Sequence, residues 1–249
     1  MIVPSSHHSS KRERAPEAEG SPTQRWPAFV INLDERPDRR SAFEAFALRS
    51  GVIAERIPAL SHDSAETAGF RSCSPKTERN EWLLSGGAFG CAASHLLVYQ
   101  AIVDAGHQGA MVFEDDVCFE PQFVARANAA LDSIPTTTHV VQFGALGQRT
   151  GHRSRILDTI HRQWTGRTRD RVAPATFGMG AHCYWLSQDF AAAAIQVFQP
   201  IWAPIDAMIC AVTHYSSWSC ERHYPVLASQ TESMSDIRTN AAAFAANAK

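Results

Sequence analysis

Short apolar runs alternate with longer segments of helical spacing along most of the chain. Residues 28–33 form a β-branched apolar run that ends in the polar stretch DERPDRR, which predicts a buried strand followed by a loop. Over residues 40–50 apolar side chains recur near helical spacing, and Gly51 is placed to end that helix. A second apolar run at 52–60 completes a strand, helix, strand unit, which favours a parallel sheet covered by helices.

The alternation continues toward the carboxyl end without an internal repeat. Residues 61–85 show little periodicity and predict a loop that can include a short helix. Downstream, the pattern predicts helices at 86–106, 123–134, 188–198 and 203–215, and strands at 109–113, 138–146, 178–187 and 224–230. We therefore expect a single α/β domain over residues 26–238.

Composition sets three segments apart from this domain. Residues 1–25 are polar and rich in Ser and Pro, which predicts a flexible tail, and residues 239–249 form an alanine-rich tail. Residues 149–171 hold seven arginines against two aspartates and predict an exposed basic loop or flap. That segment is either a solvated surface or a contact for phosphate and acidic groups, with Trp164 available to stack on a sugar.

Overall charge and cysteine usage narrow the environment. The net charge of -2 gives no general attraction to nucleic acid or anionic membranes, so we expect no nucleic-acid partner. Six cysteines without a CxxC pair, mostly within apolar segments, favour a reducing cytoplasm. No signal-peptide core and no apolar run of about 18 residues is found. We expect a cytoplasmic protein, with at most peripheral contact to the inner face of the cytoplasmic membrane.

Three consecutive carboxylates, Glu114, Asp115 and Asp116, follow directly after the predicted strand at 109–113. Ligands of open α/β sheets bind beyond the carboxyl ends of the strands, which is where this cluster falls. Adjacent carboxylates raise one another's pKa unless a cation neutralises them, and Mg²⁺ and Mn²⁺ prefer such oxygen ligands. From this motif alone, a solvated acidic turn or helix start explains the residues equally well.

Six segments taken in order resemble the signature blocks of one family. They are FVINLDERPDRR, GGAFGCAASHLLVYQAIV, MVFEDDVCFEP, GAHCYWLS, PIDAMI and PVLASQTESMSDI. In order and spacing they are similar to glycosyltransferase family 25, the lipooligosaccharide galactosyltransferases related to the collagen galactosyltransferases. The resemblance covers residues 28–237 and is far more specific than any single block.

The resemblance implies a GT-A-like α/β fold with a mainly parallel central sheet flanked by helices. It also implies a nucleotide-sugar donor, typically UDP-galactose, a divalent cation, Mn²⁺ or Mg²⁺, and an oligosaccharide or glycolipid acceptor of a bacterial lipopolysaccharide. Glu114, Asp115 and Asp116 match the acidic motif that bridges metal and diphosphate. The remaining positions that we assign to the nucleotide side are Asn32, Leu33, Arg36, Arg39, Arg40 and Ser94.

The last two blocks supply the other side of the expected site. Asp206 matches an acidic position near the acceptor, and Ser229 with Gln230 falls where relatives place a further polar or metal-side contact. Some relatives have a histidine there, so the third protein ligand of the metal stays open. We expect an inverting displacement with Asp206 as the first candidate base and His95 as the second.

Each of these roles has an alternative. Asp206 can be a carboxylate that stabilises a helix start, and His95 a structural histidine. Another UDP-sugar such as UDP-glucose can be the donor, and a non-catalytic nucleotide-sugar or glycan-binding protein can share the fold. A metal-dependent phosphohydrolase or nucleotidyltransferase is a further class, although the chain lacks a DxDxT motif and a GxxxxGK[ST] loop.

Overall fold

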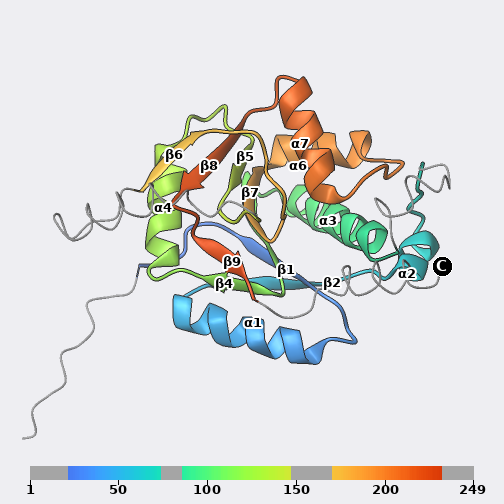
Figure 1. Ribbon diagram of the computed structural model, residues 1–249, viewed down its shortest axis with the longest axis horizontal. Coiled ribbons are helices and arrows are strands. Elements are labelled where there is room, and N and C mark those ends of the chain that lie inside the picture. The colour runs from blue at the N-terminus through green and yellow to red at the C-terminus, as the bar shows by residue number, and fades with distance from the viewer. Residues whose placement is uncertain (1–21, 74–85, 147–169, 232–249) are drawn as a thin grey trace, which may run out of the picture.

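A seven-stranded sheet of order β2-β1-β3-β7-β5-β8-β6 forms the centre of the protein (Figure 1). The computed structural model describes residues 22–73, 86–146 and 170–231. The strands are β1 (Ala28–Asn32), β2 (Glu55–Pro58), β3 (Gly109–Glu114), β5 (Val140–Gln142), β6 (Arg171–Pro174), β7 (Cys183–Ser187) and β8 (Cys220–Tyr224). β6 and β7 run opposite to the other five. The predicted α/β fold class, with a mainly parallel central sheet flanked by helices, is confirmed.

Helices cover both faces of this sheet. They are α1 (Pro37–Ser50), α2 (His62–Thr67), α3 (Gly86–Asp104), α4 (Phe123–Ser133), α6 (Gln188–Val197) and α7 (Ile205–Tyr215). α1 and α4 pack on one face, and α2, α3, α6 and α7 contribute to the apolar core on the other (Figure 1). The helix predicted to end at Gly51 does so, with that residue at φ 70° and its N–H directed to the carbonyls of Ala47 and Leu48.

Strands β1 and β3 are apolar up to their last residue because both of their faces are buried. In β1, Phe29 packs into the core on one face of the sheet and Val30 into the core on the other. In β3, Val112 packs into the same core as Phe29, and Phe113 packs into the same core as Val30. The continuous apolar runs in the sequence therefore belong to strands enclosed between two helical layers.

A second, two-stranded sheet positions the carboxyl-terminal block. β4 (Val117–Phe119) pairs antiparallel with β9 (Ala228–Gln230), and Val117 lies opposite Gln230. The N–H of Thr231 donates to the carbonyl oxygen of Asp116 at 2.7 Å. This pairing brings the end of the chain's last described strand against the acidic turn.

Several predicted segments fall wholly or partly outside the described residues. They include most of the basic segment 149–171 with Trp164, and the tails at 1–21 and 239–249. Residues 22–25 of the predicted tail contact the folded chain, since the Gln24 side chain bonds to the N–H and the carbonyl of Ile53, each at 2.8 Å. None of the described helices combines the length and apolar character needed to cross a membrane.

Candidate active site

The acidic residues lie where β3 ends and the chain turns into β4. Glu114 is the last residue of β3, and Asp115 and Asp116 form the turn. β1 runs parallel to β3, with Ile31 opposite Glu114, so the carboxyl end of β1 lies beside the same turn. The cluster therefore lies at the sheet edge where open α/β folds bind their ligands.

One arginine holds both aspartates. Arg39, in the first turn of α1, contacts Asp115 Oδ1 at 3.1 Å and Asp116 Oδ2 at 3.2 Å. Asn32, at the end of β1, donates from Nδ2 to Asp115 Oδ2 at 2.7 Å. The two aspartate side chains are 8% and 9% exposed and the Arg39 side chain 13%, so these charges interact with little screening by solvent.

Gln230 reaches the same turn from β9. Its Nε2 lies 3.2 Å from Glu114 Oε2 and 3.4 Å from Asp116 Oδ1. A half-turn of the amide would direct its oxygen at the same point instead. Gln230 thus stands between two carboxylates, where the sequence left the third metal ligand open.

The carboxylates carry more negative charge than one arginine offsets. Burial, together with the Glu114 carboxylate, raises the pKa of Asp116 to about 7 although Arg39 opposes the shift. Burial also raises the pKa of Asp115 against the opposing effects of Asn32 and Arg39. For Glu114 burial acts in the same sense, but His95, His182 and Arg39 together outweigh it and the pKa falls.

This donor set fits a hard divalent cation. Glu114 and Asp116 offer carboxylate oxygens on either side of Gln230, and burial beside the Glu114 carboxylate raises the pKa of Asp116. Oxygen ligands of this kind are those that Mg²⁺ and Mn²⁺ prefer. The three residues that could hold the ion are therefore Glu114, Asp116 and Gln230.

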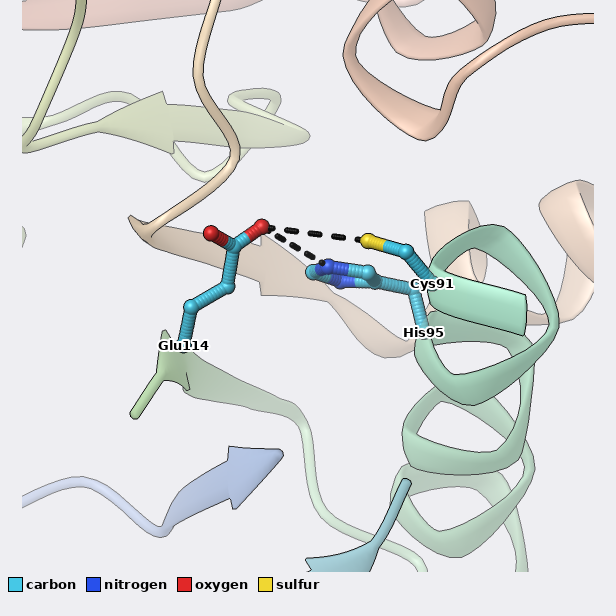
Figure 2. A group of neighbouring side chains, drawn as sticks. All are labelled: Cys91, His95 and Glu114. Carbon is cyan, nitrogen blue, oxygen red and sulfur yellow. Dashed lines mark hydrogen bonds and ion pairs between the residues drawn. The ribbon is translucent and has the colours of Figure 1, made fainter. Parts of the chain in front are cut away.

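His95 lies in the middle of α3 and faces the interior of the protein. It is fully buried on α3, and its Nδ1 shares a hydrogen bond of 2.7 Å with the hydroxyl of Tyr184. Its Nε2 points toward Glu114 Oε1 at 3.5 Å, and Cys91 Sγ lies 4.0 Å from the same oxygen (Figure 2). The structure places this histidine behind Glu114.

Asp206 is fixed at the start of α7. Its Oδ2 accepts the N–H of Gly180 at 2.9 Å, and its Oδ1 accepts the N–H of Ala207 at 2.8 Å. The residue is partly exposed, and its charge helps to raise the pKa of the Cys91 thiol on α3. Asp206 thus stabilises the start of α7, and each of its oxygens keeps a lone pair that can accept a further hydrogen bond.

Other predicted residues contact the fold itself. Arg40 is exposed and pairs with Glu44 one turn along α1. Ser94 is fully buried, donates to the carbonyl of Gly90 at 2.7 Å and accepts the N–H of Leu60 at 2.8 Å. These partners are structural, and neither side chain is placed at the acidic turn.

Three further predicted residues lie around the first and last strands. Arg36 forms an ion pair with Asp38 at 2.8 Å, while Leu33 follows β1 and is partly buried. Ser229 is exposed in β9 opposite Cys118. From the final block, Gln230 contacts the carboxylates.

Two residues near the turn were not predicted. Cys91 lies one helical turn before His95 on α3, and His182 immediately precedes β7. The His182 carbonyl accepts the N–H of Glu114 at 3.1 Å, and burial lowers the pKa of its ring. Gly144 and Gly180 leave room for this ring, since a Cβ on either would crowd it. In the sequence, Cys91 belongs to the block GGAFGCAASH and His182 to the block GAHCYWLS, and this is the signal that could have indicated them.

A hollow of about 660 Å³ opens elsewhere on the surface. It is lined by the beginning of β3 and the end of β7, with Trp26, Trp185 and Asp189 among the residues around it. These strand ends lie opposite to the edge that holds the acidic turn. None of the predicted site residues lines it, so we assign the candidate site to the acidic turn.

Comparison with known proteins identifies similar chains. The family model described as "Glycosyltransferase family 25 (LPS biosynthesis protein)" matches residues 26–209. A "Glycosyltransferase 25 family member" of Drosophila pseudoobscura pseudoobscura is 31% identical over 107 residues, 41% of this chain and 17% of the relative. Human "Procollagen galactosyltransferase 2" is 27% identical over 115 residues, 43% of this chain and 18% of the relative. A human relative named "Inactive glycosyltransferase 25 family member 3" is 28% identical over 115 residues, 43% of this chain and 19% of the relative.

The chain thus spans less than a fifth of the length of these relatives. Among solved structures, a glycosyltransferase involved in glycosylation of the major capsid of PBCV-1 aligns with a TM-score of 0.46 at 6% identity. That alignment covers 87% of this chain and 97% of the other.

Proposed function

Because the chain belongs to glycosyltransferase family 25, whose model matches residues 26–209, we propose that it is a metal-dependent galactosyltransferase. The donor is UDP-galactose, and the acceptor is a saccharide of a bacterial lipopolysaccharide or lipooligosaccharide. The family description names lipopolysaccharide biosynthesis, and one relative is named a galactosyltransferase, which supports this choice of acceptor and donor. UDP-glucose is the alternative donor.

The observation that carries the proposal is the meeting of Glu114, Asp116 and Gln230 at the carboxyl edge of the sheet. Sugar transfer breaks the bond between the anomeric carbon and the diphosphate, and negative charge develops on the leaving oxygens. A divalent cation at these residues would supply the neutralising charge for that step. Arg39, beside Asp115 and Asp116, adds a guanidinium whose geometry suits phosphate oxygens.

Asp206 is the better candidate for the base. Two backbone N–H groups fix its carboxylate, and the remaining lone pairs are free to accept the proton of an incoming hydroxyl. His95 is fully buried, with Nδ1 engaged by Tyr184 and Nε2 directed at Glu114. We therefore assign proton acceptance to Asp206, in a single inverting displacement, and a supporting position to His95.

The test is a replacement series at the acidic turn. Transfer from UDP-galactose, and the slow hydrolysis of the donor, are measured with and without Mn²⁺ for Glu114→Gln, Asp115→Asn and Asp116→Asn. We expect Glu114→Gln and Asp116→Asn to lower Mn²⁺-dependent turnover by about 10²-fold or more, since they remove charge that holds the cation. Asp132→Asn removes an exposed carboxylate on α4 and serves as the matched control.

Two results would overturn the proposal. Unchanged Mn²⁺-dependent turnover in all three variants would remove the metal role of the turn. Binding of UDP-galactose or UDP-glucose without transfer or hydrolysis would indicate a nucleotide-sugar-binding protein instead. One human relative of the chain is named an inactive family member, which is why the second outcome is tested.

A further inference from the structure

Cys91, His95 and Glu114 form a compact group between α3 and the end of β3 (Figure 2). We propose that Cys91 Sγ, His95 Nε2 and a Glu114 oxygen form a second metal site, selective for thiolate-binding divalent ions of the Zn²⁺ class. The site shares Glu114 with the hard-cation site, so an ion bound here inhibits sugar transfer. This inhibitory consequence rests on the proposed function, whereas the binding itself does not.

The fold places the three ligand atoms at the right separation. Cys91 and His95 are four residues apart on α3 and therefore project from one face of the helix toward the end of β3. The three ligand atoms all lie within 4.8 Å of one another. Around tetrahedral zinc, neighbouring ligand atoms are about 3.4–3.6 Å apart. The Nε2–Oε1 distance of 3.5 Å already matches, and the Sγ–Oε1 distance of 4.0 Å is slightly longer.

The second observation is an unsatisfied nitrogen inside the group. His95 is fully buried, and its Nε2 makes no hydrogen bond although it faces Glu114 Oε1. If Nδ1 carries the proton and donates it to the Tyr184 hydroxyl, the Nε2 lone pair faces the carboxylate. A cation between these two atoms would satisfy both. The Tyr184 hydroxyl, itself bonded to that of Tyr99 at 2.8 Å, then acts as the outer partner that orients a metal-bound histidine.

Ligand chemistry separates this site from the neighbouring one. A thiolate and an imidazole select Zn²⁺ and related ions, whereas the oxygen ligands of Asp116 and Gln230 suit Mg²⁺ and Mn²⁺. Cys91 is partly exposed and the Glu114 side chain is 24% exposed, so an ion can reach the group. The pKa of the Cys91 thiol is raised by burial and by the carboxylates of Glu114, Asp206, Asp116 and Asp115, so the thiol gives up its proton only when a cation binds, and the same negative charges attract that cation.

Binding is tested with Co²⁺ as the spectroscopic probe for Zn²⁺. The full chain is titrated with Co²⁺, and the thiolate-to-cobalt charge-transfer absorption is recorded for wild type, Cys91→Ser and Cys118→Ser. Cys118, a partly buried thiol in β4, is the matched control. We expect the band in wild type and Cys118→Ser, its loss in Cys91→Ser, and a Zn²⁺ affinity at least about tenfold weaker in Cys91→Ser.

A measurement on the wild-type chain keeps the site testable even if Cys91→Ser does not fold. Zn²⁺ should slow alkylation of Cys91 at least about tenfold, while the rate at exposed Cys73 is unchanged, as followed by peptide mass spectrometry. A wild type without the band, or a Cys91→Ser variant that keeps both band and affinity, overturns the site. So does alkylation of Cys91 that is indifferent to Zn²⁺.

The consequence for transfer is measured separately. Micromolar Zn²⁺ in excess Mn²⁺ should inhibit wild type and Cys118→Ser, whereas the concentration for half-inhibition should rise at least about tenfold in Cys91→Ser, relative to its own uninhibited rate. A Cys91-dependent cobalt band in a chain without transfer activity would retain the metal site and reject the proposed function. Transfer activity in a chain that shows no cobalt band would retain the proposed function and reject the metal site.

Discussion

Two buried aspartates share one guanidinium at the carboxyl end of the central strands. Arg39 contacts both Asp115 and Asp116, and all three side chains are less than a sixth exposed. In such surroundings charges interact strongly, and a charge that loses its partner is costly. Arg39 therefore stabilises the two buried carboxylates and holds them in position at the end of β3.

Replacement of Arg39 should show how much the stability of the fold depends on its contacts with Asp115 and Asp116. Arg39→Met keeps much of the side-chain volume but leaves two buried carboxylates without their guanidinium, and we expect the free energy of unfolding at pH 8 to fall by about 3 kcal/mol. Arg40→Met, on the same helix, removes an exposed pair with Glu44 and should change it by less than about 0.5 kcal/mol. Urea unfolding in EDTA measures both, and equal losses would contradict the argument.

Asp116 gives the protein a specific pH dependence. Its pKa rises from 3.8 to about 7 on folding, so the folded state binds more protons than the unfolded state between those pH values. The contribution of Asp116 to stability is therefore lost as pH rises from about 4 to about 7, by up to about 1.4 kcal/mol per unit. In EDTA, Asp116→Asn should gain stability relative to wild type over that range. A constant difference from pH 4 to pH 8 would refute the shift.

Asp206 allows the base assignment to be separated from donor binding. Asp206→Asn keeps an oxygen that can accept one backbone N–H but cannot take up a proton, so we expect kcat for transfer to fall by about 10²-fold or more. The dissociation constant for UDP should stay within about twofold of wild type. Steady-state kinetics and calorimetry measure the two quantities, and loss of UDP binding alone would assign Asp206 to the donor side.

At this scale the sequence predicted residue types better than their orientations. The strand that precedes Glu114 made the acidic turn predictable, and the block order indicated Arg39 and Gln230. Arg39 and Arg40 are neighbours on α1, about 100° apart around the helix, and only the packing of α1 on the sheet decides which one faces the turn. Cys91 was not predicted because its partner, Glu114, lies in another element.

At the scale of elements, α3 is docked on the segment that follows β2. A Cβ on Gly90 would clash with the carbonyl oxygen of Leu60, a backbone atom, so only glycine allows this approach. One turn later Ser94 accepts the N–H of Leu60. These contacts fix the helix that carries Cys91 and His95, so Ser94 supports the site through the position of α3.

Ser94→Ala should therefore affect stability through α3. The N–H of Leu60 loses its acceptor in a partly buried setting, and we expect a loss of about 1–3 kcal/mol in the free energy of unfolding. Ser133→Ala, whose hydroxyl only donates to a carbonyl at the end of α4, should stay within about 0.5 kcal/mol. A larger loss of UDP affinity than of stability would restore the nucleotide-side role that the sequence suggested for Ser94.

Element prediction succeeded where both faces of a strand are apolar. β1, β3 and β7 stood out for that reason, whereas β8 reads Cys-Glu-Arg-His-Tyr and was missed. Its Arg222 is 3% exposed because it donates to Gln142 Oε1 at 3.0 Å and to the carbonyl of Thr176. The acceptor on Gln142 is 80 residues away in the chain, so no local pattern reveals that this charge belongs inside the sheet.

At the scale of the molecule, the site joins three parts of the chain that are far apart in sequence. Asn32 and Arg39 come from the first strand and helix, the carboxylates from the end of β3, and Gln230 from β9. A ligand that bridges these parts binds the folded state alone and stabilises the whole fold by mass action. Stability is therefore a direct readout of the assembled site.

Ligand binding should therefore appear as a rise in thermal stability. At about a hundred times its dissociation constant, UDP with Mn²⁺ should stabilise the chain by about 2.7 kcal/mol, which corresponds to a rise in Tm of roughly 5–10 °C for a chain of this size. Asp116→Asn should lose the part of the shift that depends on Mn²⁺ and retain the part due to UDP alone, because Arg39 and Asn32 are unaltered. Differential scanning fluorimetry with UDP, Mn²⁺ and both separates the two contributions. If Mn²⁺ adds nothing to the effect of UDP in wild type, the carboxylates of the turn do not hold a cation against the diphosphate, and Arg39 alone would have to neutralise the leaving group.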